Sequence, residues 1–346
     1  MQAAQLVGVR DLRVVDLPSP PDPGPGEAQV RVLAVGVCGS DRHQYLEGAI
    51  GDAPARFPQI LGHEPVGLVL HAGPGVSGLE PGMPAALEPA IYCGRCEFCL
   101  TGHHNVCKNI RFLSNPGEPG FFREFVNLPA ENVLPLPPSL SPAIATLYEP
   151  LAVALNAMKL AAIRPGESAA VFGAGPIGLL TIAMARLSGA TRIYAVDRVP
   201  ARLELARLMG ADCVIDFSAA RPDQAILADT SKGGVDVAFE AAGSQESLNQ
   251  CLRVTRAAGR VLMIGIPAEV TVALEFHEMR RKELALLNVR RQNHNAHMAI
   301  RLLAESRFPA GEIVTHTLPL AAVDSAFRLL ENYEDGVGKA VITVPD

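Results

Sequence analysis

Residues 169–178 read Ala-Ala-Val-Phe-Gly-Ala-Gly-Pro-Ile-Gly, an apolar run followed by three glycines at GxGxxG spacing. The apolar run predicts a buried strand, and the apolar residues at 179–187 predict a helix directly after the glycines. In that setting the first glycine permits a tight turn, the second lets a pyrophosphate approach the backbone, and the third allows close helix–strand packing. The stretch therefore predicts a dinucleotide site at a helix N-terminus.

Asp197 completes this predicted site, because it ends the next predicted strand about 20 residues beyond the last glycine. A carboxylate there accepts hydrogen bonds from both ribose hydroxyls and repels a 2′-phosphate, which favours NAD over NADP. The neighbouring Arg198 and Arg202 leave open that the protein uses both NAD and NADP. An ordinary turn with a solvated carboxylate is the alternative. The residues assigned to cofactor binding are Gly173, Gly175, Pro176, Ile177, Gly178, Asp197, Arg198, Arg202, Ala242, Gly265 and Ile266.

The alternation of short strands and helices continues well beyond the glycine turn. The predicted elements are strands at 192–196, 213–216, 235–240 and 260–264, and helices at 201–208 and 246–256. Repeated strand–helix alternation is typical of a parallel sheet covered by helices on both faces. This part of the chain is therefore assigned to the α/β class.

The first 150 residues have a different rhythm. Short β-branched runs such as 29–35 alternate as strands do, and Gly- and Pro-rich turns separate them. After about residue 287 the sequence predicts a helix at 297–305 and extended segments near Ile313 and Val341. We expect this tail to return to the first domain. The predicted boundaries are thus 1–150 with 288–346 for a β-rich domain, and 151–287 for a nucleotide-binding domain.

Composition limits the classes of function. A chain of 346 residues suits two domains of roughly 150 residues each. Its 49% hydrophobic and 19% charged residues favour a well-buried globular protein. A net charge of -6 without a basic block argues against nucleic acid as a partner. Because neither a secretory leader nor a spanning apolar run is evident, we expect a cytoplasmic protein without membrane attachment.

Four of the seven cysteines lie at metal-ligand spacing in a Gly-containing loop. Four thiolates around one ion leave no open position, which is typical of a structural zinc. Disulfides are the alternative, but a reducing compartment disfavours them. His103 and His104 lie inside the same loop and are interpreted as surface residues. The predicted ligands are Cys93, Cys96, Cys99 and Cys107.

Cys38 and His63 suggest a second metal site, although they are too far apart for spacing alone to define one. Either residue alone would more often be a core or surface residue than a ligand. Both lie among glycines, and a thiolate with an imidazole suits zinc with room for a carboxylate or water. Glu64 and Glu149 are the carboxylate candidates.

At this point the sequence resembles a known family, the medium-chain zinc alcohol dehydrogenases, and within it the sorbitol (polyol) dehydrogenase branch. The resemblance covers nearly the whole chain and implies a GroES-like β-rich catalytic domain with both zinc sites, plus a Rossmann domain. It also implies a homotetramer, or less often a dimer. The motifs that carry it, in family order, are Cys38-Gly39-Ser40-Asp41, Gly62-His63-Glu64, the four-cysteine loop, Glu149-Pro150-Leu151-Ala152-Val153 and the glycine turn at 173–178.

The resemblance assigns roles to the metal-site candidates. Cys38 and His63 would bind the catalytic zinc, with Glu149 as third ligand or as the group that holds a zinc-bound water. Glu64 would lie in or just behind the metal's ligand sphere and exchange onto the metal as substrate enters. The Glu-Pro-Leu form at Glu149 is similar to the polyol branch, because other alcohol dehydrogenases place a cysteine near that point.

Further residues are assigned to proton transfer and substrate binding. Ser40 and His43 match positions that relay the alcohol proton to solvent, and a surface role is the alternative for His43. Arg291 resembles an arginine that holds the polyol site together, and Tyr45 and Phe112 are further substrate candidates. Gln292 departs from the tyrosine that sorbitol enzymes place after that arginine, which puts sorbitol itself in doubt.

The resulting hypothesis is an NAD-dependent dehydrogenase with one catalytic and one structural zinc per chain. Its substrate would be a small molecule, a polyol, sugar or sugar acid. The enzyme would oxidise a secondary alcohol of this substrate to a ketone by hydride transfer to NAD. Threonine 3-dehydrogenase-like or general secondary-alcohol activity is the enzymatic alternative. An NAD-binding structural or regulatory protein is the non-enzymatic one.

Overall fold

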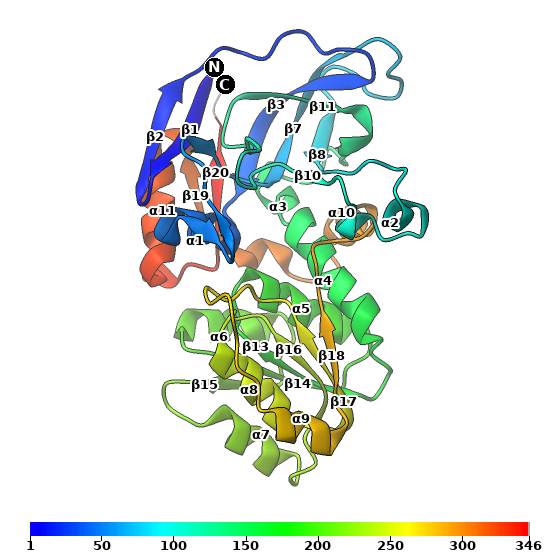
Figure 1. Cartoon of the computed structure of the whole chain (residues 1–346), viewed down its shortest axis with the longest axis vertical. Helices are drawn as coiled ribbons and strands as arrows, with labels where there is room; N and C mark the ends of the chain where they lie inside the picture. The colour runs from blue at the N-terminus through cyan, green and yellow to red at the C-terminus, as the bar shows by residue number, and fades with distance from the viewer. Residues whose placement is uncertain (345–346) are drawn as a thin grey trace. The chain divides into compact units, whose positions relative to one another are not determined.

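The computed structural model describes residues 1–344, which form two compact units (Figure 1). The first unit contains Met1–Glu149 and the chain from Ala296 onward, and the second contains Pro150–Asn295. The return to the first unit comes at Ala296 rather than at residue 288. The reason is that strand β18 (Ala285–Asn288) pairs with strand β17 (Thr255–Met263), and Asn295 after it donates to the Ala152 carbonyl.

The second unit is built on one six-stranded sheet in which each pairing is parallel. Its order is β15-β14-β13-β16-β17-β18, so the strands run 3-2-1-4-5-6 when counted along the chain. This is the order of doubly wound dinucleotide-binding sheets, in which ligands bind where the order reverses. The remaining strands are β13 (Ser168–Phe172), β14 (Arg192–Asp197), β15 (Cys213–Asp216) and β16 (Val235–Glu240).

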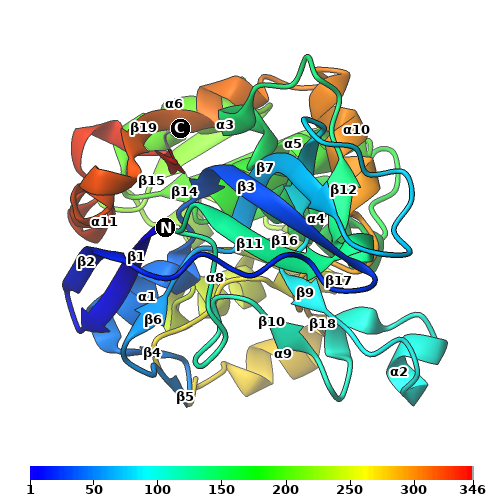
Figure 2. The same cartoon turned by 90° about the horizontal axis from the view of Figure 1, so that it is seen from above.

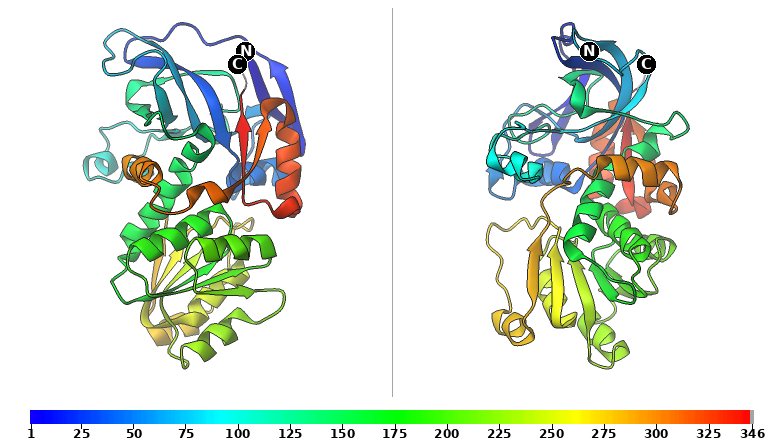
Figure 3. Two further views of the ribbon diagram at one scale, coloured as in Figure 1. Left: turned by 180° about the vertical axis from the view of Figure 1, so that it is seen from behind. Right: turned by 90° about the vertical axis from the view of Figure 1, so that its right-hand side faces the viewer.

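Helices cover both faces of this sheet (Figure 3), which confirms the predicted fold class. The helix after the glycines, α5, is buried along residues 178–185, which explains why its sequence is an almost continuous apolar run. Ser244 caps α8 by accepting from the Ser247 N–H, and α8 ends two residues earlier than predicted because β17 begins at Thr255. The helices are α4 (Tyr148–Ala161), α5 (Pro176–Leu187), α6 (Pro200–Leu208), α7 (Pro222–Asp229), α8 (Gln245–Val254) and α9 (Phe276–Lys282).

The first unit is β-rich, as its alternating runs predict. Its main sheet has the order β12-β8-β7-β3-β20-β19, and β11 also pairs with β3. Strands β3 and β7 lie side by side through this unit in the view from above (Figure 2). The strands of this sheet are β3 (Glu27–Gly36), β7 (Glu64–Ala72), β8 (Pro84–Leu87), β11 (Phe125–Pro129), β12 (Val133–Pro135), β19 (Val314–Pro319) and β20 (Lys339–Thr343).

A smaller sheet and several helices also belong to the first unit. Strand β1 (Gln2–Gly8) lies between β2 (Asp11–Asp16) and β6 (Gln59–Ile60). The α-helices of this unit are α1 (Gly39–Glu47), α2 (Glu97–Leu100), α3 (Pro142–Ala145), α10 (Ala296–Ala304) and α11 (Val323–Asn332). β20 pairs with β3, so the end of the chain lies next to a strand from its beginning. Within residues 1–344 no helix is long and apolar enough to cross a membrane.

Candidate active site and cofactor turn

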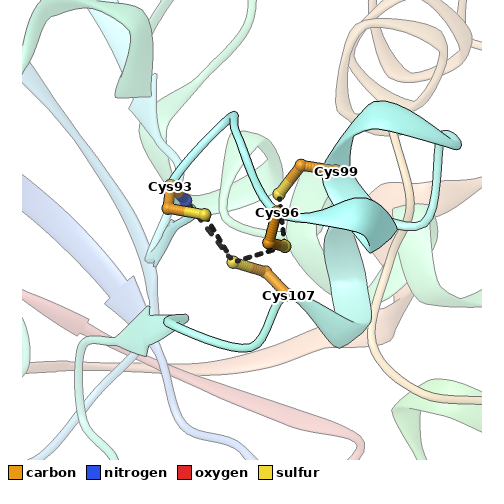
Figure 4. Close-up of side chains that lie close together, drawn as sticks. All are labelled: Cys93, Cys96, Cys99 and Cys107. Atoms are coloured by element: carbon orange, nitrogen blue, oxygen red, sulfur yellow. Dashed lines mark hydrogen bonds between the residues drawn. The ribbon is translucent and has the colours of Figure 1, made fainter.

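The four predicted zinc-ligand cysteines lie together in the loop between β9 (Ala90–Ile91) and β10 (Arg111–Phe112). Their sulfur atoms all lie within 4.8 Å of one another (Figure 4). The neighbouring pairs Cys96–Cys99 and Cys93–Cys107 are 3.5 Å apart, well beyond the length of about 2.05 Å that a disulfide requires. Neither His103 nor His104 belongs to this group.

Backbone donors and burial shift the pKa values of these thiols in opposite directions. Backbone N–H groups near Arg95 and Cys96 lower the pKa of Cys93 to about 6, and similar donors lower the pKa of Cys96. Burial raises the pKa of Cys99 to about 12. Four sulfurs at this spacing would repel one another as thiolates unless a cation lay between them. The donor set therefore fits a structural zinc with no open position.

The second group of possible ligands consists of Cys38, His63 and Glu64, whose ligand atoms also lie within 4.8 Å of one another. The sheet register brings them together, because Gly36 at the end of β3 pairs with Glu64 at the start of β7. Cys38 is the N-cap of α1 and remains partly exposed, whereas His63 and Glu64 are buried. A thiolate, an imidazole and a carboxylate form a donor set that fits zinc.

Gly62 is needed for the approach of His63. Its φ is +90°, in the region that favours glycine. A Cβ at this position would lie 2.9 Å from Val35 and 3.1 Å from the Phe122 ring. The tight passage into β7 therefore depends on a residue without a side chain.

Asp41 organises this second group, although the motif analysis gave it no role. Its carboxylate is fully buried and accepts from the Cys38 N–H at 3.1 Å, the Gly62 N–H at 3.2 Å and the Ser114 hydroxyl at 2.9 Å. Asp41 is the third residue of α1, whose N-cap is Cys38, and a carboxylate at this position can accept from the backbone of the cap. This capping pattern is the feature of the sequence that could have identified Asp41.

Asp41 and His63 also shift one another's pKa. Burial alone raises the pKa of Asp41, but the His63 charge and the surrounding donors outweigh it and leave the pKa below 3.8. Burial lowers the pKa of His63, and the charges of Asp41 and Cys38 overcome that effect and hold it well above 6.5.

Glu149 is close to this group but is not a member of it. It is 5% exposed near the start of α4, and the preceding Tyr148 hydroxyl donates to the Leu87 carbonyl at 2.7 Å. Burial raises the pKa of Glu149 to about 8; the charge of His63 lowers it, and the carboxylates of Glu64 and Glu88 raise it further. A buried carboxyl that resists ionisation is poised to lose its proton to a cation placed beside it.

Ser40, His43 and the substrate candidate Phe112 all lie in the first unit, and two of them contact His63 directly. Ser40 Oγ lies 3.5 Å from His63 Nε2, and His43 Nδ1 lies 2.9 Å from Glu47 Oε2 at a partly exposed position. Phe112 packs against the His63 ring with 5.4 Å between centroids.

Tyr45, in contrast, is a core residue. It is 2% exposed, and its ring lies 5.0 Å from that of Phe327 in α11. Its hydroxyl donates to Asp324 at 3.2 Å. The structure therefore places Tyr45 in the core of the first unit, and composition alone does not distinguish a position on α1 that faces the core from one that faces a ligand.

In the second unit, the three glycines after β13 differ in how closely other atoms approach them. A Cβ on Gly173 would lie 2.7 Å from the Ala242 nitrogen, and one on Gly178 would lie 1.8 Å from the Gly173 oxygen. A Cβ on Gly175 would meet only Arg202 Nη1, at 3.7 Å. The first and third glycines are thus required by packing, while the second leaves open space at the N-cap of α5.

Asp197 lies beside this turn and holds it through the backbone. Its Oδ2 accepts from the Ala174 N–H at 2.6 Å, and its Oδ1 accepts from the N–H groups of Arg198 and Val199. Arg202 is 7% exposed on α6. The Asp197 carboxylate therefore stabilises the backbone of the turn, a structural role that the sequence did not reveal.

Glu240 was missed at the sequence level and arranges the other side of the turn. Its Oε1 accepts from the N–H groups of Ala242 and Gly243, while Gly265 donates to its backbone carbonyl. Ile266 follows with 39% exposure. The cofactor candidates thus follow β13, β14, β16 and β17, at the carboxyl ends of parallel strands.

Arg291 and Gln292 belong to the segment between β18 and α10. Arg291 has a φ of +53°, and its carbonyl accepts from Asn156 Nδ2 at 2.9 Å, which ties this segment to α4. These contacts lie within the second unit and show how the segment is held.

A doubly wound sheet with a glycine turn, and a β-rich unit with one closed and one open zinc-type donor set, define a class of oxidoreductases that use zinc and a nicotinamide nucleotide. Comparison with known families agrees. The family described as "Alcohol dehydrogenase GroES-like domain" matches residues 24–138, and "Zinc-binding dehydrogenase" matches residues 176–305. The chain belongs to the zinc-dependent medium-chain alcohol dehydrogenases, in their polyol branch.

Three relatives indicate the range of activities nearby. Sorbitol dehydrogenase of Bacillus subtilis is 32% identical over 99% of this chain and 97% of the relative. L-idonate 5-dehydrogenase of Vitis vinifera is 32% identical over 94% of this chain and 90% of the relative. L-threonine 3-dehydrogenase of Pyrococcus horikoshii is 39% identical over 73% of this chain and 72% of the relative.

Solved structures share the whole fold. Alcohol dehydrogenase from Thermus sp. ATN1 aligns with a TM-score of 0.91 at 30% identity and covers 100% of both chains. 2R,3R-butanediol dehydrogenase from Bacillus subtilis aligns with a TM-score of 0.88 at 32% identity, over 100% of this chain and 99% of that one.

Proposed function

We propose that this enzyme oxidises a secondary alcohol of a polyol, sugar or sugar acid to a ketone and transfers the hydride to NAD. The observation that carries the proposal is the open donor set of Cys38, His63 and Glu64, with Glu149 nearby, in a chain whose full-length relatives include sorbitol and L-idonate dehydrogenases. The closed cysteine group would hold a structural zinc, so each chain would bind two zinc ions.

The catalytic zinc would be held by Cys38 and His63, with Glu149 as the third ligand or as the group that holds a zinc-bound water, and with Glu64 just behind the metal's ligand sphere. When bound there, zinc supplies Lewis-acid chemistry that lowers the pKa of an alcohol. Asp41 orients the His63 ring through Nδ1. The low exposure of His63, Glu64 and Glu149 excludes water from their side of the site.

Ser40 and His43 are proposed to carry the substrate proton to solvent. Ser40 Oγ lies beside His63 Nε2, and the His43–Glu47 pair lies one turn further along α1 at the surface. The kcat of His43→Ala should lose part of the pH dependence that the unmodified protein shows. An unchanged pH–rate profile would remove His43 from the relay.

NAD is favoured over NADP because Asp197 carries the only acidic side chain at the end of β14 (Arg192–Asp197). Its charge would repel a 2′-phosphate, whereas the nearby Arg198 and Arg202 would attract one. A relative from Sinorhizobium meliloti, a candidate zinc-binding dehydrogenase at 32% identity, has been solved with NADP, so both nucleotides need testing.

A substrate screen tests the proposal directly. NAD and NADP reduction would be followed with polyols, aldonates, simple secondary alcohols and L-threonine. The expected result is the highest kcat/KM with a polyol or aldonate and NAD. A preference for L-threonine would replace the proposal with the second candidate, which the 39% identity to L-threonine 3-dehydrogenase favours. Turnover of none of these, with one zinc per chain, would favour a non-enzymatic NAD-binding protein.

We also propose a cytoplasmic homotetramer, with a dimer as the alternative. Among residues 1–344, β18 pairs with β17 alone, which leaves its other edge available to a second copy. Apolar side chains near it in sequence are exposed, including Val270 at 75% and Phe276 at 57%. Light scattering on the purified protein should give four times the 36.6 kDa chain mass. A monomer would contradict this proposal.

A further inference from the structure

Lys339 is a buried lysine that reaches the candidate metal group from the opposite end of the chain. It is the first residue of β20 and is 1% exposed. Its Nζ forms an ion pair with Oε2 of Glu64, which is itself 0% exposed. A lysine is rarely buried so completely unless it is paired.

Gly36 makes this contact possible. In the sheet, β3 lies between β20 and β7, and Gly36 pairs with Val341 on one side and with Glu64 on the other. A Cβ on Gly36 would lie 2.0 Å from Glu64 Oε2 and 2.8 Å from Lys339 Cε. The absence of a side chain at Gly36 thus opens a path across β3 through which the lysine and the glutamate meet.

The Glu64 carboxylate therefore faces two potential cations. One is the Lys339 ammonium, and the other is the ion that Cys38, His63 and Glu64 together suit. If the Glu64 carboxylate moved fully onto the metal, the buried Lys339 ammonium would lose its partner, which is strongly unfavourable. The position of Lys339 consequently affects how many protein ligands the metal acquires.

We infer that Lys339 is a positioning residue that holds Glu64 back from the zinc and so keeps a coordination position open for substrate. This inference rests on the proposed function, because it requires a metal bound at Cys38 and His63. The alternative is that the ion pair only satisfies two buried charges and has no effect on the metal.

The test uses the full-length protein with Co²⁺ in place of zinc, because cobalt absorption reports the number and type of ligands. In Lys339→Met, Glu64 should bind the metal, so the visible spectrum should change and chelator-induced cobalt release should slow on the order of tenfold. The double variant Lys339→Met/Glu64→Gln should regain the original spectrum. Lys339→Arg keeps the charge and should resemble the unmodified protein.

Identical spectra and release rates for Lys339→Met and the unmodified protein would overturn the inference. Because a buried methionine could prevent folding, Lys339→Gln serves as a second neutral variant, and thermal unfolding checks each protein. An unchanged cobalt spectrum in a folded Lys339→Gln protein would also overturn it. If the unmodified protein takes up cobalt only at the four-cysteine group, the proposed catalytic site fails instead.

Discussion

Asp41 Oδ1 lies 3.3 Å from His63 Nδ1, while Ser40 Oγ lies 3.5 Å from the other ring nitrogen of the same histidine. The two nitrogens therefore have different neighbours: Nδ1 faces a buried carboxylate, and Nε2 faces the Ser40 hydroxyl. Carboxylate partners of this kind fix the orientation of a metal-binding imidazole and raise its basicity.

Replacing Asp41 by Asn should weaken zinc binding without removing a ligand. The amide keeps the shape of the side chain but loses the charge that faces His63, and zinc affinity or activity should fall about 10- to 100-fold. Zinc content after dialysis against a chelator measures the effect. Asp11→Asn, at an exposed carboxylate paired with Arg13, is the control. Equal zinc retention by both variants would contradict this role for Asp41.

Gly175→Ala and Gly178→Ala should fail in different ways. A Cβ at 178 collides with the Gly173 carbonyl, so this variant should lose about 1–3 kcal/mol of stability in urea unfolding. A Cβ at 175 meets only Arg202, so Gly175→Ala should unfold near the unmodified midpoint but bind NAD more weakly. Calorimetric titration with NAD separates the two. Full NAD affinity in Gly175→Ala would mean that the pyrophosphate does not approach this glycine.

Cys93→Ser should remove one of two zinc ions and leave the other. The remaining three sulfurs cannot complete the closed group, so the loop between β9 and β10 should become sensitive to proteases. Metal analysis and limited proteolysis check this, with Cys213→Ser, which lies outside both donor groups, as the control. Loss of both zinc ions would show that the two sites are coupled.

The sequence predicted the glycine turn and the cysteine group well because their spacing is local. Three glycines between a strand and a helix, or four cysteines within fifteen positions, have few structural solutions. Asp41, Glu240 and Lys339 could not be identified in this way. Their importance depends on burial and on partners such as Glu64, which is far from Lys339 in sequence and close to it only through strand pairing. The core packing of Tyr45 against Phe327 depends on burial in the same way.

The stability contributed by Asp236 should depend on pH in a defined direction. Burial raises the pKa of Asp236. Hydrogen bonds from Ser168 and the Arg256 guanidinium lower it by more than burial raises it, so the pKa lies below 3.8. A folded-state pKa below the unfolded value stabilises the fold above that unfolded value, and the contribution disappears as the pH falls through the folded-state pKa.

Asp236→Asn should therefore destabilise the protein at neutral pH by about 1–3 kcal/mol. The difference from the unmodified protein should shrink as the pH falls below about 4. Urea unfolding of both proteins at several pH values measures this. A difference that stays constant from pH 7 to pH 3 would assign the effect to shape rather than charge.

Asp197→Asn should shift the enzyme toward NADP while keeping part of the bracing of the glycine turn. The single amide oxygen can accept either from the Ala174 N–H or from the N–H groups of Arg198 and Val199, so one of these two sets of contacts keeps its acceptor and the other loses it. The negative charge that would repel a 2′-phosphate is lost, and the charges of Arg198 and Arg202 remain. We expect the ratio of kcat/KM for NADP to that for NAD to rise about tenfold, equivalent to about 1.4 kcal/mol. Asp197→Ala removes the acceptor as well and should weaken binding of both nucleotides. If Asp197→Asn lowered both affinities equally and left their ratio unchanged, the carboxylate would act only as a brace for the turn, and nucleotide choice would have to reside elsewhere.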